Sequence, residues 1–134
     1  MERITRVLFV EDNDISRELI RRIFKRIELI HVDMARDGKE ALNLFRAHQY
    51  DLVFMDIQLP EMDGFEVTRH IREADHRKRR HTPVIAVTAL VGNEDQKRCR
   101  EAGMDDYVPK PVNTQDLLDK IEKYIPRTET FKEQ

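Results

Sequence analysis

The stretch VFMDIQLPEMDG, which runs from Val53 to Gly64, joins a strongly apolar run to a carboxylate. Leu52 leads into three more apolar residues, a pattern typical of a strand that is buried on both faces. The run ends on Asp56, and a proline, further acids and a glycine then turn the chain away. A charge at the end of a buried strand costs free energy unless something compensates it. Asp56 is therefore a candidate functional residue.

Apolar runs alternate with helical patterns along the chain. The expected strands are Val7–Val10, Ile30–Met34, Leu52–Met55, Val84–Val87 and Tyr107–Val108, and the expected helices cover residues 15–27, 37–45, 65–71, 94–102 and 117–125. This alternation predicts an α/β fold whose parallel sheet is covered on both faces. The second run alternates and the fifth is short, so we expect both at the sheet edges. The pattern matches a flavodoxin-like, doubly wound, five-stranded parallel sheet with five helices and strand order 2-1-3-4-5.

Helix faces and helix ends can also be predicted. A stripe with a spacing of four, Ile15, Leu19, Ile23 and Ile27, predicts the buried face of the first helix. The segment from Asp37 to Glu40 has the spacing of a capping box. For later helices we expect Gly103 as a C-cap, Asn113 or Thr114 as an N-cap, and Pro126 as a stop.

Composition narrows the class of protein. The chain has 134 residues, with 24 basic and 26 acidic ones, which gives no overall attraction to nucleic acid or to an anionic membrane. The basic segment Arg77–Arg80 lacks interleaved aromatic residues and is interpreted as a solvated loop, so we expect no direct nucleic-acid binding. No apolar stretch approaches the roughly 18 residues of a membrane span, and the charged segment Met1–Arg6 is unlike a signal peptide. Cys99 is the single cysteine, which fits a cytoplasmic protein without an internal disulfide.

Polar groups follow four of the expected strands at their carboxyl ends. Glu11 and Asp12 follow the first strand, Asp56 ends the third, Thr88 ends the fourth and Lys110 follows the fifth. In such sheets these ends meet at one edge, so three carboxylates would face one ammonium. Clustered carboxylates repel one another, and a divalent cation with hard oxygen ligands, such as Mg²⁺, would neutralise the excess charge. A carboxylate beside a bound metal can also attack phosphorus.

These residues carry a close resemblance to the receiver domain of two-component signalling, the phospho-acceptor module of response regulators and hybrid histidine kinases. The matching segments are VLFVEDN (Val7–Asn13), VFMDIQLPEMDG, TPVIAVTA (Thr82–Ala89) and AGMDDYVPKP (Ala102–Pro111). They occur in order at the strand ends. The resemblance covers the chain from Arg6 to about Ile125 and implies a receiver domain over residues 1–126 with a short polar tail over 127–134.

The resemblance implies a role for each of these polar residues. Asp56 would accept a phosphoryl group from a phosphohistidine on a histidine kinase or a histidine phosphotransfer domain. Mg²⁺, for which Mn²⁺ can substitute, would be held by Glu11, Asp12, Asp56 and the backbone carbonyl of Gln58.

Three further roles are implied. Thr88 and Lys110 would contact phosphoryl oxygens, and Tyr107 would change rotamer as a switch that alters a face binding an output partner. A cis peptide bond between Lys110 and Pro111 is also implied, and an X–Pro bond adopts it at little cost. The chain would thus be a regulatory phospho-acceptor rather than an enzyme.

Other interpretations remain open at the level of single residues. Glu11 and Asp12 could simply begin a helix, Asp56 could be a turn residue, and Tyr107 could pack at an edge strand. The alternative functions are a same-fold phosphatase and a flavin or nucleotide binder. The phosphatase would need an acid where Gln58 stands, and the binder would need a phosphate loop where Glu11 and Asp12 would repel phosphate.

Overall fold

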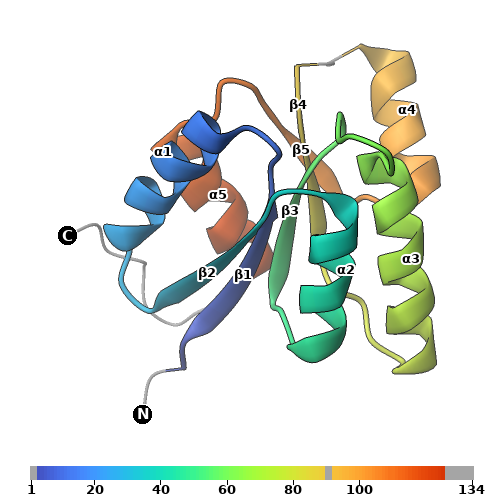
Figure 1. The fold of residues 1–134 in the computed structure, drawn as a ribbon, viewed down its shortest axis with the longest axis horizontal. Helices are drawn as coiled ribbons and strands as arrows, with labels where there is room; N and C mark the ends of the chain where they lie inside the picture. Colours follow the sequence, from blue (N-terminus) through green and yellow to red (C-terminus); the bar gives the residue numbers. More distant parts are fainter. Residues whose placement is uncertain (1–2, 90–91, 126–134) are drawn as a thin grey trace.

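A computed structural model of the chain describes residues 3–89 and 92–125 (Figure 1). The strands are β1 (Thr5–Val10), β2 (Ile30–Ala35), β3 (Leu52–Asp56), β4 (Val84–Thr88) and β5 (Asp106–Pro109). The helices are α1 (Asp14–Lys25), α2 (Gly38–Ala47), α3 (Gly64–Arg77), α4 (Asn93–Ala102) and α5 (Thr114–Tyr124). Every predicted strand and helix is present. The predicted helix stop at Pro126 and the predicted tail over 127–134 lie outside the described residues.

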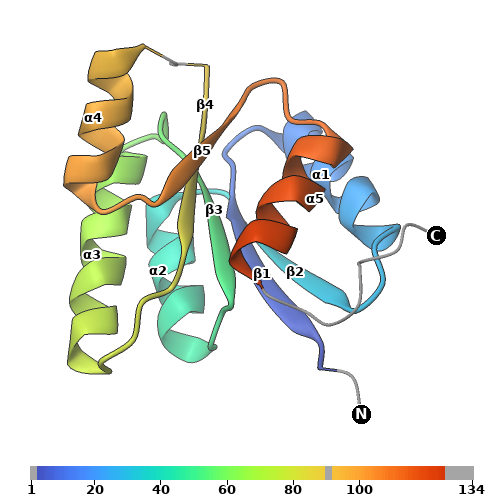
Figure 2. The ribbon, with the colours of Figure 1, turned by 180° about the vertical axis from the view of Figure 1, so that it is seen from behind.

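The strands form one parallel sheet with the order β2-β1-β3-β4-β5, as predicted. Helices α1 and α5 cover one face of the sheet, and α2, α3 and α4 cover the other (Figures 1 and 2). Two hydrophobic clusters follow from this arrangement, one beneath each layer of helices. The central strands are therefore buried on both sides, and their polar groups lie at the strand ends.

The three central strands consist largely of apolar residues with no exposed surface, from Val7 to Val10 in β1, Leu52 to Met55 in β3, and Val84 to Val87 in β4. Phe9 and Phe54 are register partners on neighbouring strands, and their rings stack with centroids 5.2 Å apart. Burial of side chains of this size contributes roughly 1.5–3 kcal/mol each. This packing fixes β3 and hence the position of its last residue.

The predicted apolar face of α1 is wrong in its first half. Ile15 is 82% exposed and Leu19 is 54% exposed, whereas Ile20 and Phe24 are buried against the sheet. A spacing of four residues advances by about 40° more than one helical turn at each step. The stripe from Ile15 to Ile27 therefore winds around the helix, and its first residues face solvent.

The helix ends follow the predicted caps with one difference. The Asp37 side chain accepts a hydrogen bond from the N–H of Glu40 at 2.8 Å, but the Glu40 side chain accepts from the N–H of Arg36, so the capping box is only half formed. Asn113, rather than Thr114, is the N-cap of α5. Gly103 ends α4 with φ of 99°, a left-handed conformation that favours glycine.

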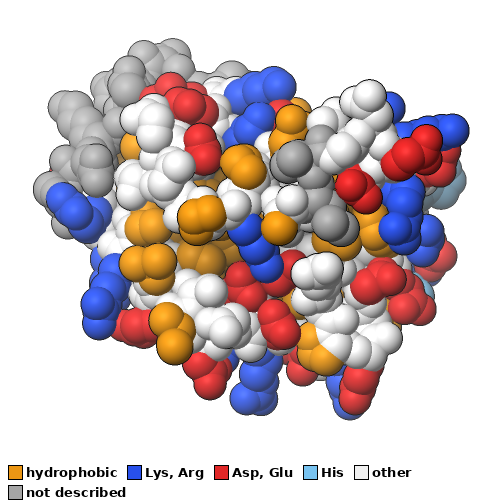
Figure 3. Space-filling view, turned by 90° about the horizontal axis from the view of Figure 1, so that it is seen from above, with side chains coloured by type: hydrophobic (Ala, Val, Ile, Leu, Met, Phe, Trp, Pro, Cys, Tyr) orange, Lys and Arg blue, Asp and Glu red, His pale blue; other side chains and the backbone are white. Residues whose placement is uncertain are grey.

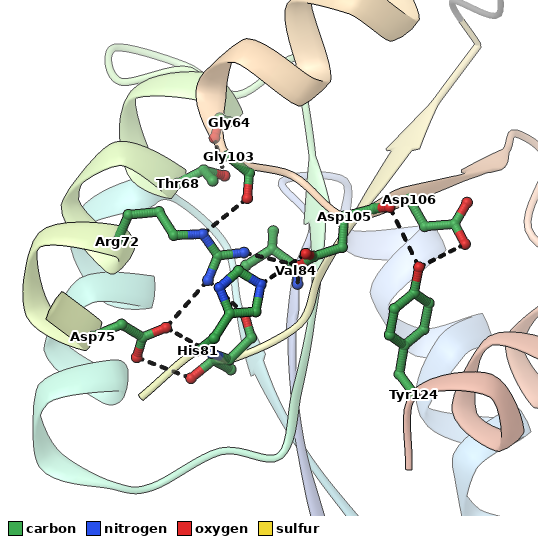
Figure 4. Close-up of polar contacts among 11 residues, drawn as sticks. Gly64, Thr68, Arg72, Asp75, His81, Val84, Gly103, Asp105, Asp106 and Tyr124 are labelled. Carbon is green, nitrogen blue, oxygen red and sulfur yellow. Dashed lines mark hydrogen bonds and ion pairs between the residues drawn. The ribbon is translucent and has the colours of Figure 1, made fainter. Parts of the chain in front are cut away.

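At the amino ends of β4 and β5, a network centred on Arg72 joins three segments (Figure 4). The Arg72 guanidinium donates to the carbonyl oxygens of Gly103 and Thr82 at 2.8 and 2.7 Å, and to the carboxylates of Asp105 and Asp75 at 2.8 and 3.1 Å. The network ties α3 to the start of β4 and to the connection between α4 and β5. It therefore anchors the carboxyl-terminal end of α4.

Candidate functional site

The predicted polar residues lie together at the carboxyl ends of the strands. Glu11 and Asp12 follow β1, Asp56 is the last residue of β3, Thr88 is the last residue of β4, and Lys110 follows β5. One carboxylate oxygen from each of the three acids lies within 4.8 Å of the other two. The parallel register brings these groups to one edge, as expected from the chain order of the strands.

Lys110 points back into this group of acids. Its Nζ atom lies 2.9 Å from Oδ2 of Asp56 and 3.9 Å from Oε1 of Glu11. Its backbone N–H donates to the carbonyl oxygen of Thr88 at 3.0 Å, which holds the segment after β5 against β4. The peptide bond between Lys110 and Pro111 is cis, as the sequence resemblance implied.

Two of the three carboxylates are buried. Glu11 is 3% exposed and Asp56 is 1% exposed, whereas Asp12 is exposed. Burial raises the pKa of Glu11 to about 7; the N–H of Asn13 lowers this pKa, and the nearby charge of Asp56 raises it. One ammonium against three carboxylates leaves the group with an excess of negative charge, which a further cation would neutralise.

The loop after β3 holds Asp56 in place. The N–H of Gln58 donates to Oδ1 of Asp56 at 3.0 Å, so lysine and loop each bind one carboxylate oxygen. A Cβ atom on Gly64 would lie 2.3 Å from the carbonyl oxygen of Asp56, and the Gly64 N–H donates to the carbonyl of Ile57. Only glycine fits this close approach of α3 to the strand end. Sequence reasoning identified the turn at Gly64 but missed this contact.

Thr88 and Tyr107 lie on the β4–β5 side of the group. Thr88 is buried at the end of β4, and Tyr107 is half-buried on the edge strand β5. The Tyr107 hydroxyl accepts a hydrogen bond from Nε2 of Gln96 on α4 at 3.5 Å. Tyr107 also lines a cavity of about 220 Å³ together with Cys99 and Met104. The ring therefore has both a partner on α4 and space beside it.

Figure 3 views the carboxyl ends of the strands from above. Acidic side chains and a basic one gather near the middle of this face, and hydrophobic side chains gather on its left, the side of α1 and α5. Ile15 and Leu19 supply exposed apolar surface to α1. The charged group thus opens to solvent beside an apolar patch.

The profile of the response regulator receiver domain matches residues 7–122 of the chain. The chain belongs to this family. The match runs from Val7 in β1 into α5, so it includes all the polar residues described above. This receiver domain is thus a module of two-component signal transduction, and nothing supports the phosphatase or flavin-binding alternatives.

Known relatives include both short regulators and long kinases. The polar-differentiation response regulator DivK of Brucella anthropi is 40% identical over 121 residues, which are 89% of this chain and 94% of that protein. Hybrid signal transduction histidine kinase B of Dictyostelium discoideum is 37% identical over 126 residues, which are 87% of this chain and 6% of that protein. This receiver domain therefore spans nearly all of one relative and a small part of the other.

Solved structures of other receiver domains share the fold. The receiver domain of sensor histidine kinase PA1611 from Pseudomonas aeruginosa, with a magnesium ion in its active-site cleft, is 31% identical with a TM-score of 0.80; the alignment covers 92% of this chain and 99% of that one. A second match is the co-crystal structure of the histidine phosphotransfer protein Ypd1 and the receiver domain of Ssk1 from Saccharomyces cerevisiae. The matched chain is 30% identical to this one with a TM-score of 0.82, and the alignment covers 92% of this chain and 90% of that one.

The donor set of this receiver domain fits a divalent cation. Three carboxylates offer hard oxygen ligands within reach of one another, and one of them is exposed, which leaves room for water in the coordination shell. Such a set favours Mg²⁺ over softer metals.

Among residues 3–89 and 92–125, no helix is both long and apolar enough to cross a membrane.

Proposed function

We propose that Asp56 accepts a phosphoryl group from a phosphohistidine of a histidine kinase or a histidine phosphotransfer domain. The observation that carries this proposal is a buried carboxylate at the end of a central strand, with an ammonium 2.9 Å away and two further carboxylates beside it. A carboxylate oxygen of Asp56 forms a bond to phosphorus as the bond between phosphorus and the donor imidazole breaks. The imidazole takes the bonding electron pair.

Mg²⁺ is the cofactor we propose, with Mn²⁺ as a substitute, held by Glu11, Asp12, Asp56 and the backbone carbonyl of Gln58. When bound, the ion would offset the negative charge of the three carboxylates and stabilise the negative charge on the phosphoryl oxygens. Lys110 binds one phosphoryl oxygen, and the Thr88 hydroxyl donates to another. Transfer of this kind depends mainly on positioning and on charge stabilisation. The strand ends provide the positioning, and Lys110 together with the bound ion provides the charge.

The phosphodonor docks on the apolar patch of α1, formed by Ile15 and Leu19. Ile15 and Leu19 are four residues apart on α1, so their side chains, 82% and 54% exposed, adjoin on the helix surface. Contiguous exposed apolar surface often marks an interaction site. A partner that covers them would bring its phosphohistidine to Asp56. The pairing of a phosphotransfer protein with the receiver domain of Ssk1 in yeast supports a partner of this class.

Phosphorylation acts through Tyr107. Thr88 moves toward the phosphoryl group, the Tyr107 ring turns inward, and the face formed by α4, β5 and α5 changes its affinity for an output protein. The buried residues of α4 are Cys99 and Ala102, so this helix can shift at low cost. We propose that the chain is a regulator of this kind and not an enzyme, and that its receiver domain covers residues 1–126. We also propose that it works in the cytoplasm, where the free thiol of Cys99 stays reduced.

The test is labelling with acetyl phosphate and Mg²⁺. We expect one phosphoryl group per chain, labile to hydroxylamine, and no label in the presence of EDTA. Asp56→Asn should remove the label. Asp63→Asn is the matched control, because Asp63 is the exposed N-cap of α3 in the same loop. A label of equal extent in Asp56→Asn would overturn the proposal.

A further inference from the structure

Arg17 on α1 turns back toward the acidic group. Its Nη1 atom donates to the backbone carbonyl oxygen of Glu11 at 2.9 Å, and its Nη2 atom pairs with the carboxylate of Asp14. The side chain is 13% exposed, whereas its neighbours Arg21 and Arg22 on the same helix are 48% and 73% exposed. Arg17 is therefore held against the loop between β1 and α1 rather than spread on the surface.

The hydrogen bond from Arg17 to the Glu11 carbonyl oxygen constrains the backbone at Asp12. The carbonyl of Glu11 and the N–H of Asp12 belong to one planar peptide group, so fixing that oxygen fixes the direction in which the chain enters Asp12. The other ends of this loop are already tied: the Glu11 N–H donates to Ala35, and the Asn13 N–H donates to the Glu11 carboxylate at 3.1 Å. Asp12 is exposed, so packing does not hold its side chain, and the direction of its backbone sets which positions its carboxylate can reach.

We propose that Arg17 is a positioning residue for the metal-binding carboxylates. It holds the peptide between Glu11 and Asp12 so that the Asp12 carboxylate faces those of Glu11 and Asp56. The inference rests on the proposed binding of a divalent cation at these three acids. It adds a residue that touches neither the cation nor the phosphoryl group but sets the geometry of the ligands.

A positioning role and a purely electrostatic role predict opposite signs. A guanidinium near a cation site repels the cation, so removal of its charge alone would strengthen metal binding. Loss of the hydrogen bond would instead free the Glu11–Asp12 peptide and weaken binding. Groups that orient metal ligands typically contribute about 10-fold to 100-fold in affinity, which exceeds the effect of a screened charge near the surface.

The experiment is calorimetric titration of the unphosphorylated protein with Mg²⁺ and, separately, Mn²⁺. We expect Arg17→Met to weaken binding about 10-fold. Arg17→Lys should be intermediate, because an ammonium keeps the charge and can donate to the Glu11 carbonyl but cannot also hold Asp14 in the same geometry. Arg21→Met removes the same charge from the exposed face of α1 and should leave the affinity within about twofold of the original.

Each outcome decides the inference. Equal or tighter binding by folded Arg17→Met, judged by circular dichroism, overturns the positioning role while leaving the metal site intact. Absence of binding by the unaltered protein overturns both the site and the role. If Arg17→Met does not fold, Arg17→Lys decides, and an affinity equal to that of the unaltered protein then counts against the role.

Discussion

The ammonium nitrogen of Lys110 lies 2.9 Å from Oδ2 of Asp56, although the two residues are 54 positions apart in the chain. Asp56 ends the central strand β3, and Lys110 follows the edge strand β5. Their contact therefore depends on the pairing of β3, β4 and β5 in the sheet. The second oxygen of Asp56 accepts the N–H of Gln58. The carboxylate is thus fixed at both oxygens before any phosphodonor arrives.

Removal of this ammonium should slow phosphorylation. Lys110→Met leaves developing charge on the phosphoryl oxygens without a donor, and the loss of one such group typically costs about 100-fold in rate. The measurement is the rate of labelling by acetyl phosphate at saturating Mg²⁺. Lys97→Met removes an exposed lysine of α4 that is 4.0 Å from Glu101 and should label normally. Labelling of Lys110→Met at the original rate would remove Lys110 from the site.

Substitution of the apolar patch on α1 should separate docking from chemistry. The double variant Ile15→Ser, Leu19→Ser should accept phosphate from a phosphohistidine protein at least about 10-fold more slowly, because full burial of a leucine or isoleucine side chain contributes roughly 1.5–3 kcal/mol. Labelling by acetyl phosphate should stay unchanged. Ile4→Ser, which alters an exposed isoleucine before β1, is the control. An equal loss with both donors would indicate damage to the site rather than to docking.

Formation of the phosphorylated state should move α4. In NMR spectra, beryllofluoride with Mg²⁺ should shift amide signals from Asn93 to Val108 as well as those around Asp56. Arg72 anchors the carboxyl-terminal end of α4, whereas the N-cap of the helix is Gly92, which has no side chain to cap it. The same addition to Asp56→Asn should produce no such shifts. Changes restricted to the strand ends would argue against a switch through this face.

Acid should weaken the fold through Asp106, which joins β5 to α5. Burial raises the pKa of Asp106, but hydrogen bonds from Lys123, Lys120, the Tyr107 N–H and Tyr124 outweigh it and lower the pKa to about 2. Because the folded pKa lies below the usual 3.8, the carboxylate stabilises the fold above about pH 4, and that contribution is lost as the pH falls toward 2.

Solvent screening at its exposed partner Lys123 limits this contribution to about 1 kcal/mol. Urea unfolding between about pH 6 and pH 2.5 can measure it. Asp106→Asn should remove that part of the acid dependence, whereas Asp119→Asn, which alters an exposed residue bonded to Gln115 within α5, should retain it. An unchanged acid dependence in Asp106→Asn would contradict the assignment.

The fold could be predicted because each level of the sequence agrees with it. The doubly apolar runs at Val7 and Leu52 define central strands, and the residue types after each strand end define the site once the order of a parallel sheet is known. The site needed no side-chain detail, since parallel strands bring their carboxyl ends to one edge. For Lys110, the structure adds the distances of its ammonium from the carboxylates of Asp56 and Glu11, 2.9 and 3.9 Å.

Three features lay beyond sequence reasoning. The orientation of α1 depends on which residues meet the sheet, and spacing could not separate the Ile15 stripe from the buried face of Ile20 and Phe24. The contacts of Arg17 and Arg72 are with backbone carbonyl oxygens, and such contacts leave no pattern in residue types. The close approach at Gly64 is signalled only by the glycine itself, which a simple turn would also explain.

The most direct test is to locate the phosphoryl group on the chain. Treatment of the acetyl-phosphate-labelled protein with borohydride converts an aspartyl phosphate to homoserine, which peptide mass spectrometry can place. We predict homoserine at residue 56, formed only with Mg²⁺, and unmodified aspartate at Asp12, Asp51 and Asp63. Homoserine at any of those other positions, with residue 56 unchanged, would contradict the assignment of Asp56 as the phospho-acceptor.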